Sequence, residues 1–274
     1  LTHRIAYLVR VGLASPHSIL ALTFTKKAAN EMRDRLSHLL GQHADKLTLG
    51  TFHSLALRIV KTECEKLGFN PNALLVYDAA DAREVLKRAI QQAQLDESRW
   101  NVEQIAEAIT HAKNQLRGPT ECVRVKGDYF EEMVAMVYAI YQELLKQANA
   151  VDFDDLILFA VKLLRDFPDV LEFYQTIYRY VLVDEFQDTG ELQYDLIRLI
   201  CQRHENLCVV GSPAQAIYGW RGVNTPAILS RFERDFPTTD IVVLDQNFRS
   251  TQTIITAANT VIKGPSTGFI PAPP

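Results

Sequence analysis

Short runs rich in Val, Ile and Leu recur along the chain, with polar and helix-forming segments between them. Runs that are apolar throughout, rather than at alternate positions, are typical of strands buried on both faces of a parallel sheet. We therefore predict five strands, at residues 18–24, 47–52, 180–185, 207–212 and 241–246. Helical segments between several of them give the strand–helix–strand order of a doubly wound α/β domain.

Helical periodicity is clear in segment 26–40, which places Ala29, Met32, Leu36 and Leu40 on one face. The segment directly follows the first predicted strand. This is the order expected of a strand–helix–strand unit.

The middle of the chain has a different pattern. From about residue 61 to residue 167 we find no convincing strand and several helices, two of which Asp78 and Asn101 are predicted to cap. Segment 129–148 carries apolar residues at helical spacing, namely Met133, Val137, Ile140 and Leu144. We interpret this helical block as a subdomain inserted into the sheet domain.

The composition narrows the class of protein. Hydrophobic residues make up 47% of the chain and charged residues 23%, as in ordinary globular proteins. No apolar run approaches the roughly 20 residues that cross a bilayer, and no secretory signal is visible at the start. Four widely spaced cysteines argue against a zinc site or a disulfide framework. We therefore expect a cytoplasmic protein without a membrane partner.

The net charge of −4 hides an asymmetry along the chain. Lys and Arg outnumber Asp and Glu in residues 1–60, whereas the reverse holds in residues 151–200. A basic segment combined with an acidic one is compatible with a protein that binds a polyanion and also holds a cation. Solvated faces of any protein can show the same pattern.

The sequence YVLVDEFQDT, residues 180–189, runs an apolar strand directly into carboxylates. At the end of a buried strand, Asp184 could help to hold Mg²⁺, and Glu185 could accept a proton from an attacking water. The alternative is a strand that leaves the core and turns in solvent. The residues alone leave both interpretations open.

Aromatic residues gather in the sequence VVGSPAQAIYGWRG, residues 209–222. Tyr218, Trp220 and Arg221 lie within four residues of one another, after Gln215. Exposed aromatic rings beside a cation suit stacking on unpaired bases. A local core turn with a cation–π pair is an equally good interpretation.

Three further segments each end a predicted strand with polar or aromatic residues. Phe248 and Arg249 follow 241–246. An Arg near a γ-phosphate can stabilise transition-state charge, although an ordinary surface Arg is the simpler interpretation.

The segments LTFTKKAANEM and GTFHSLALRI each run from a predicted strand through Thr-Phe into a helix. The N-terminus of such a helix suits contacts with phosphate groups. His53 taken alone would be a structural histidine.

In this order, TFTKKAANEM, TFHS, VDEFQDT, AIYGWRG and NFRS resemble the motifs of the UvrD/Rep/PcrA type of superfamily 1 DNA helicases. The resemblance spans nearly the whole chain and includes the helical insert, with AVDFDDLI at its end. It implies a RecA-like P-loop NTPase fold, an α/β parallel sheet with helices on both faces, interrupted by an all-helical subdomain. It also implies ATP-driven 3′→5′ movement on single-stranded DNA and unwinding of duplexes, in repair or replication.

The resemblance implies a division of the chain into four parts. Residues 1–60 and 168–263 would form the first motor subdomain, 1A, and residues 61–167 the helical subdomain 1B. Residues 264–274, rich in Gly, Pro and Ser, would form a flexible tail or a linker.

The resemblance also implies roles for single residues, with ATP and Mg²⁺ as cofactors. Asp184 would coordinate Mg²⁺, Glu185 would activate the water, and Gln215 would contact the γ-phosphate. Phe248 would lie against the adenine, and Arg249 would reach the γ-phosphate. Six residues would serve the single-stranded DNA path and its coupling to ATP: Phe24, Thr51, His53, Tyr218, Trp220 and Arg221.

Two departures from the family pattern bear on activity. The Gly-rich loop that cradles phosphates would lie upstream of residue 1, so we expect the isolated chain to hydrolyse little or no ATP and to expose a sheet edge. We also expect the second motor domain of the family to lie outside these residues. Ser212 and Ala214 occupy positions where the family usually has acidic residues. A non-catalytic DNA-binding module and the helicase part of a helicase-nuclease therefore remain as alternatives.

Overall fold

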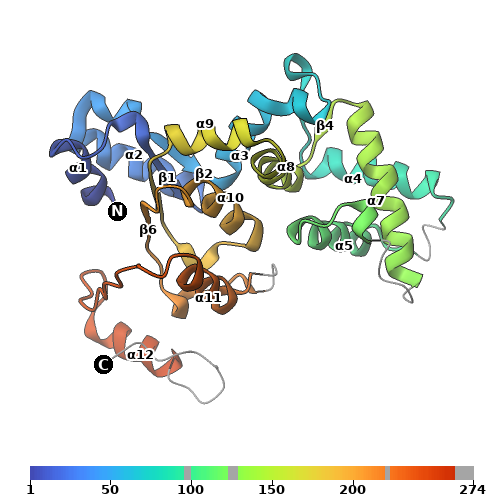
Figure 1. Cartoon of the computed structure of the whole chain (residues 1–274). Helices are drawn as coiled ribbons and strands as arrows, with labels where there is room; N and C mark the ends of the chain where they lie inside the picture. Colours follow the sequence, from blue (N-terminus) through green and yellow to red (C-terminus); the bar gives the residue numbers. More distant parts are fainter. Residues whose placement is uncertain (96–99, 123–128, 220–222, 263–274) are drawn as a thin grey trace.

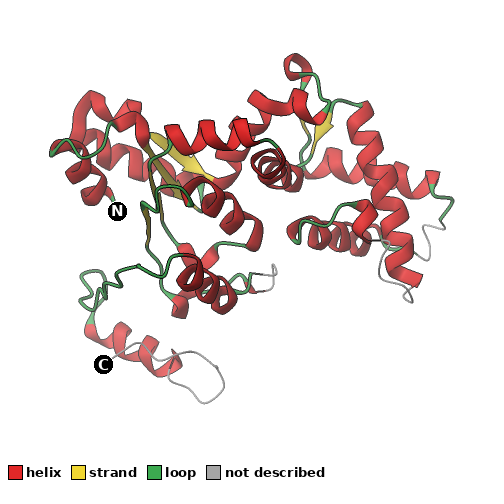
Figure 2. Ribbon diagram, viewed as in Figure 1, coloured by secondary structure: helices red, strands yellow, loops and turns green. Residues whose placement is uncertain are grey.

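The structure is a computed structural model that describes residues 1–95, 100–122, 129–219 and 223–262. Helices dominate it, and the strands form one small sheet and a two-stranded pair (Figure 2). No helix in the described part of the chain is long and apolar enough to cross a membrane.

The main sheet has four parallel strands in the order β2-β1-β5-β6. Their bounds are Ile19–Thr23 for β1, Thr48–Thr51 for β2, Tyr180–Val183 for β5 and Leu207–Val209 for β6. The first four predicted strands are thus confirmed, each slightly shorter than its apolar run.

Helices cover both faces of the sheet (Figure 1). On one face the strands pack against α3 (Phe52–Glu63), α8 (Phe153–Asp166) and α10 (Glu191–Cys201); on the other they pack against α1 (Thr2–Arg10) and α2 (Lys26–Leu40). Successive residues of one strand divide between the faces: Leu20 and Leu22 join the first core, Ile19 and Ala21 the second. Burial on both faces explains the continuous apolar runs and confirms the α/β fold class.

The helix predicted over 26–40 is present as α2 with the same bounds. Its four buried residues are the predicted ones, Ala29, Met32, Leu36 and Leu40. The hydroxyl of Thr25 caps it by accepting the N–H of Ala28 at 3.1 Å.

The fifth predicted strand, at 241–246, is wrong. Residues 241–247 have no regular secondary structure, and Ile241, Val242 and Leu244 are more than three-quarters exposed. A strand requires a neighbouring backbone to complete its ladder, and no described strand pairs with this segment. The segment instead runs from α11 (Thr225–Asp235) towards α12 (Gln252–Ile262) (Figure 1).

The helical insert has a core of its own, formed by α4 (Ala79–Gln92), α5 (Val102–Asn114) and α7 (Tyr129–Gln147), with the short α6 (Pro119–Cys122) beside it (Figure 1). The caps predicted at Asp78 and Asn101 are confirmed, since both side chains accept backbone N–H groups of the following helix.

Two details of the insert correct the sequence prediction. Two-residue strands, β3 (Leu75–Val76) and β4 (Ala150–Val151), pair in parallel where no strand was expected. The buried face of α7 is centred on Val134, Tyr138 and Tyr141, while Met133 and Ile140 are only partly buried. Tyrosines do not register as apolar in a simple periodicity, although their rings supply much of this core.

Packing links the insert to the sheet domain. Helix α8 lies against α3, and its buried side chains belong to the same core as β1 and β5. Helix α9 (Pro168–Ile177) follows it. The boundaries proposed at residues 60 and 167 stay predictions.

Short 3₁₀ helices occur in the described residues at Pro16–Ser18, Gly41–Lys46, Cys64–Leu67, Pro71–Ala73, Phe186–Asp188 and Pro213–Gln215.

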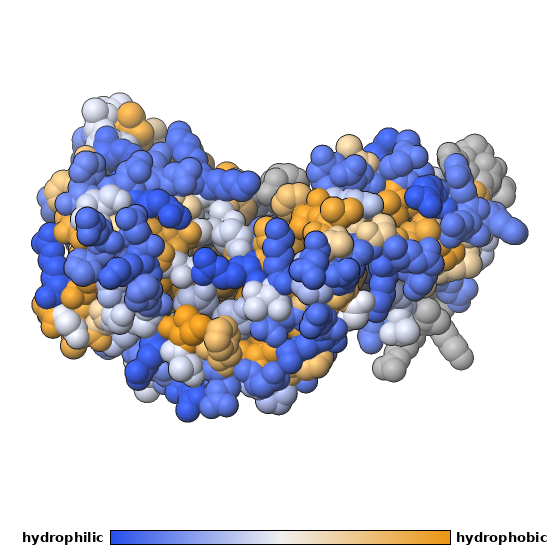
Figure 3. Space-filling model, turned by 90° about the horizontal axis from the view of Figure 1, so that it is seen from above, coloured by the Kyte–Doolittle hydropathy of each residue, from blue (hydrophilic) through white to orange (hydrophobic). Residues whose placement is uncertain are grey.

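The surface seen from above is mainly hydrophilic, with separate hydrophobic patches over both halves of the molecule (Figure 3).

Ion pairs connect the helices of the sheet domain. Asp195 of α10 pairs with Arg165 of α8 and Arg231 of α11, each at 2.8–2.9 Å.

Candidate active site and nucleic-acid interface

The carboxyl ends of the parallel strands meet at one edge of the sheet, which is where α/β proteins bind ligands. Asp184 follows β5 directly, and its N–H donates to the carbonyl of Leu22 in β1 at 2.9 Å. The N–H of Phe186 donates to the carbonyl of Val210, just beyond β6, also at 2.9 Å. Backbone hydrogen bonds thus fix the DEFQ turn between the ends of β1 and β6, the two strands that flank β5.

Asp184 is half-buried, and its pKa is raised by burial and by the nearby carboxylate of Glu185. A bound cation would favour the ionised form and offset that repulsion. The described residues contain no cluster of three or more side chains suited to hold a metal. Mg²⁺ commonly takes one or two carboxylates and completes its shell with water and phosphate, so the donor set at Asp184 fits this ion.

Glu185 has a left-handed backbone conformation, with φ 52° and ψ 46°. This conformation is uncommon for residues other than Gly, Asn and Asp, and it is concentrated at functional sites. Its exposed carboxylate accepts a hydrogen bond from Nε2 of Gln187 at 2.7 Å. The turn therefore presents Glu185 to the solvent side of the sheet edge, where a water molecule can reach it.

Asp188, the third carboxylate after the apolar run, is buried, and the sequence patterns assigned it no individual role. Its pKa is raised by burial and by Glu185, and its Oδ1 has no hydrogen-bond partner among the described residues. The carboxylate of Glu185 thus contributes to the raised pKa of both Asp184 and Asp188.

Gln215 ends the 3₁₀ turn Pro213–Gln215 that follows β6. Its N–H donates to the carbonyl of Ser212 at 2.9 Å, and its side chain is exposed. The structure thus places Gln215 in the loop that packs on the DEFQ turn.

Two of the predicted DNA-contacting aromatics lie together. The rings of Phe24, after β1, and Tyr218, after the Gln215 turn, stack with centroids 5.0 Å apart and planes 30° apart. Both rings are partly exposed. A stacked pair at the rim of a sheet edge offers a π-face on which a base can stack.

Thr51 and His53 lie at the start of α3. The hydroxyl of Thr51 accepts the N–H of Ser54 at 3.2 Å in a capping box, so this side chain is already engaged in the fold. The ring of His53 lies 6.0 Å from that of Phe153 at the start of α8. Burial lowers the pKa of His53, and the carboxylate of Asp154 opposes that shift. Burial therefore favours the neutral form of His53.

Phe248 and Arg249 are not brought to the Asp184 edge. Phe248 is 88% exposed, and the backbone N–H of Arg249 donates to the side chain of Asn247. No hydrogen bond or ion pair within the described residues joins Arg249 to Asp184 or Glu185. The physical reason is that segment 241–246, which would carry them there, pairs with no strand. Trp220 and Arg221 lie outside the described residues.

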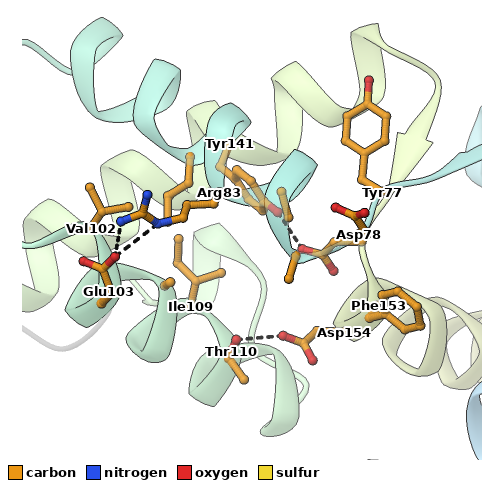
Figure 4. Close-up of a pocket in the computed structure, with 15 residues that line it drawn as sticks. Tyr77, Asp78, Arg83, Val102, Glu103, Ile109, Thr110, Tyr141, Phe153 and Asp154 are labelled. Atoms are coloured by element: carbon orange, nitrogen blue, oxygen red, sulfur yellow. Dashed lines mark hydrogen bonds and ion pairs between the residues drawn. The ribbon is translucent and has the colours of Figure 1, made fainter.

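A cavity of about 310 Å³ lies in the helical insert (Figure 4). The Arg83–Glu103 ion pair borders it, as do hydrogen bonds from Thr110 to Asp154 and from Tyr141 to Asp152, each 2.7 Å long. Most of its lining is apolar, from helices α4 and α5. The sequence patterns gave no indication of this cavity.

A buried charged cluster adjoins this cavity and shares Asp152 with its lining. Lys113 of α5 is fully buried and pairs with Asp152 at 2.6 Å and with Asp155 at 2.8 Å. Burial opposes its charge, but the two carboxylates outweigh that effect and raise the pKa of Lys113. The segment AVDFDDLI thus holds an ion cluster that joins α5 to α8.

Comparison with known proteins agrees with the α/β fold. The sequence profile described as the UvrD/REP helicase N-terminal domain matches residues 1–237. The chain is 44% identical over 266 residues to ATP-dependent DNA helicase PcrA of Bacillus subtilis (strain 168). The aligned region covers 97% of the chain and 36% of that relative. It is 42% identical over 266 residues to PcrA of Staphylococcus aureus (strain Mu50), with the same coverage. The chain thus spans about a third of the length of these relatives.

Proposed function

The chain belongs to the UvrD/REP helicase N-terminal domain family, and we propose that it forms a nucleotide- and DNA-binding motor region of an ATP-dependent DNA helicase. The proposal covers ATP hydrolysis, movement along single-stranded DNA and action at duplex junctions, in DNA repair or replication and in the cytoplasm. We also propose that the full-length protein contains a second motor domain, outside these residues.

The observation that carries the proposal is the Asp184–Glu185 turn at the carboxyl edge of the sheet. Asp184 would hold Mg²⁺, which when bound neutralises charge on the phosphate oxygens. Glu185 would accept the proton of the attacking water, since its carboxylate faces solvent and is held by Gln187. Gln215 would contact the γ-phosphate from the adjoining turn, whereas Phe248 and Arg249 would serve the adenine and the γ-phosphate only after segment 241–249 moves to the sheet edge.

The DNA path would begin at the Phe24–Tyr218 stack and continue towards His53. This proposal is supported by the stacked rings and by the position of His53 beside Phe153. Trp220 and Arg221 are assigned to the same path from their motif alone. Thr51 would act through its backbone and its cap rather than through a free hydroxyl.

Substitution of Glu185 by Gln in the full-length protein tests the catalytic part. The amide cannot accept the proton, so we expect DNA-stimulated phosphate release to fall by about 10²–10⁴-fold while ATP binding is retained. Glu172→Gln is the matched control, because Glu172 is an exposed glutamate whose partner is Arg203. Undiminished phosphate release in Glu185→Gln would reject the assignment.

A non-catalytic DNA-binding module is the second candidate, because the stacked rings of Phe24 and Tyr218 can bind a base without any nucleotide at the Asp184 turn. Two measurements on the unmodified full-length protein separate the candidates. A helicase releases phosphate when single-stranded DNA is added, whereas the module binds the same DNA without any release.

A further inference from the structure

We propose that Gln187 is a positioning residue that holds the general base Glu185 to the turn carrying Gln215. The inference rests on the proposed function for the roles of Glu185 and Gln215. Its structural part, a single buried amide joining two loops, stands on the contacts alone.

The amide of Gln187 bridges two segments that are far apart in the sequence. Its Nε2 donates to Oε2 of Glu185 at 2.7 Å, and its Oε1 accepts the N–H of Ser212 at 3.0 Å. Gln187 is only 4% exposed, so its amide is shielded from water even though the carboxylate of Glu185 faces solvent.

The two partners fix the orientation of this amide. Glu185 offers only acceptors, and the Ser212 backbone N–H offers only a donor. A reversed amide would place oxygen against the carboxylate and NH₂ against N–H, losing both bonds. Glutamine is therefore the residue type that satisfies both partners at once, whereas a glutamate would repel Glu185.

Packing leaves the bridge little room to move. A Cβ atom on Gly211 would lie 2.7 Å from Oε1 of Gln187 and 3.1 Å from its backbone N, so only glycine allows this approach. On the other side, the hydroxyl of Thr225 at the start of α11 donates to the carbonyl of Gln187 at 2.8 Å. The residue is thus held at both its backbone and its side chain.

Displacement of the Ser212 turn is therefore transmitted to Glu185 through one amide. Gln215 lies three residues beyond Ser212, and Tyr218 lies three residues further on, in the stack with Phe24. A base on the stack or a phosphate at Gln215 acts on this turn. The bridge then sets the position of the carboxylate that takes up the proton, which couples DNA binding to hydrolysis.

The test uses Gln187→Met in the full-length protein, since Met keeps the length of the side chain and removes both hydrogen bonds. Gln175→Met is the matched control, because Gln175 is also buried and donates one hydrogen bond, to the carbonyl of Leu199 at 2.8 Å. We expect Gln187→Met to lower kcat of DNA-stimulated ATP hydrolysis about 10- to 100-fold, the usual cost of losing an outer-shell partner. KM for ATP and Tm should stay close to those of the control.

Hydrogen exchange at the Ser212 amide gives a readout that needs no ATP turnover. Pro213 has no N–H, which simplifies the peptide that reports on Ser212. Exchange should be faster in Gln187→Met and unchanged in both Gln175→Met and Glu185→Gln. Gln187→Glu should keep the Ser212 amide protected, since its carboxylate still accepts that N–H, but it should lower kcat by repelling Glu185.

These readouts separate the possible failures. Faster exchange with unchanged kcat in Gln187→Met would show a merely structural bond and overturn the positioning role. Unchanged exchange would overturn the bridge itself. A wild-type protein without ATP turnover would reject the proposed function, while the exchange result still decides whether the bridge exists.

Discussion

At the residue scale, the environment of His53 determines what kind of DNA contact it can make. Burial lowers the pKa of its imidazole and so favours the neutral ring. A neutral ring can stack or hydrogen-bond, but it releases no counterion when it meets a phosphate. If His53 lines the DNA path, it contributes affinity without salt dependence.

We therefore expect His53→Ala to weaken binding of single-stranded DNA at pH 7.5 by about 1–3 kcal/mol while the slope of log K against log salt stays unchanged. Lys26→Ala, at the N-terminus of α2, is the comparison, because we propose a DNA phosphate contact for this exposed lysine, whose loss would reduce the salt slope by about 1. Fluorescence anisotropy at several salt concentrations measures both. A reduced slope in His53→Ala would show that the histidine binds DNA as a cation.

The same scale shows where sequence patterns stop being informative. Asp184 and Glu185 were identified as candidates because an apolar run leads directly into them, and their roles were implied by the family resemblance. Gln187 and Gly211 were not, since their role depends on a contact between segments 24 residues apart in the sequence, and no local pattern reports it. The left-handed backbone of Glu185 also has no signal in the residue type.

At the element scale, the Lys113 cluster is the main polar link between α5 and α8. Lys113 has no exposed surface, and Tyr141 of α7 adds a hydrogen bond to Asp152 at 2.7 Å. Removing one member of a buried ion cluster leaves an uncompensated charge, which costs far more than loss of an exposed pair.

Lys113→Met should therefore lower the free energy of unfolding by about 3–5 kcal/mol, because Asp152 and Asp155 would remain buried without their cation. Chemical denaturation followed by circular dichroism measures the change. Lys66→Met is the control, since Lys66 forms an exposed pair with Asp169, and it should have only a small effect. Equal effects of the two substitutions would contradict the buried-cluster argument.

Elements with complete local signals were predicted well. Helix α2 has one apolar face and a Thr cap, and its bounds and buried residues match the prediction. Strands β1 and β5 are apolar throughout because both faces are covered. Segment 241–246 has the same composition, but strand formation depends on a partner that no local pattern contains.

At the scale of the whole molecule, the sheet ends at β6, which pairs with β5 and with no other described strand. Beyond the sheet, residues 241–244 read Ile-Val-Val-Leu, and their side chains are between 58% and 82% exposed. An extended, apolar, β-prone segment without a partner is a template for pairing with another chain. This chain has both an open sheet edge and such a segment. The segment of one copy can therefore form backbone hydrogen bonds with the edge strand of another copy.

We therefore expect a polypeptide of these 274 residues to self-associate, and Val242→Lys with Leu244→Lys to reduce that association. Charges in a β-prone segment oppose pairing because each lysine would lose water where the segment joins the edge strand of another copy. Ile254→Lys with Val261→Lys is the matched control, since these residues are 58% and 77% exposed but lie on α12, whose backbone bonds are internal. Light scattering measured over a range of protein concentrations compares the self-association of the two double variants. Equal reduction by both would mean that net charge, rather than strand pairing, governs the association.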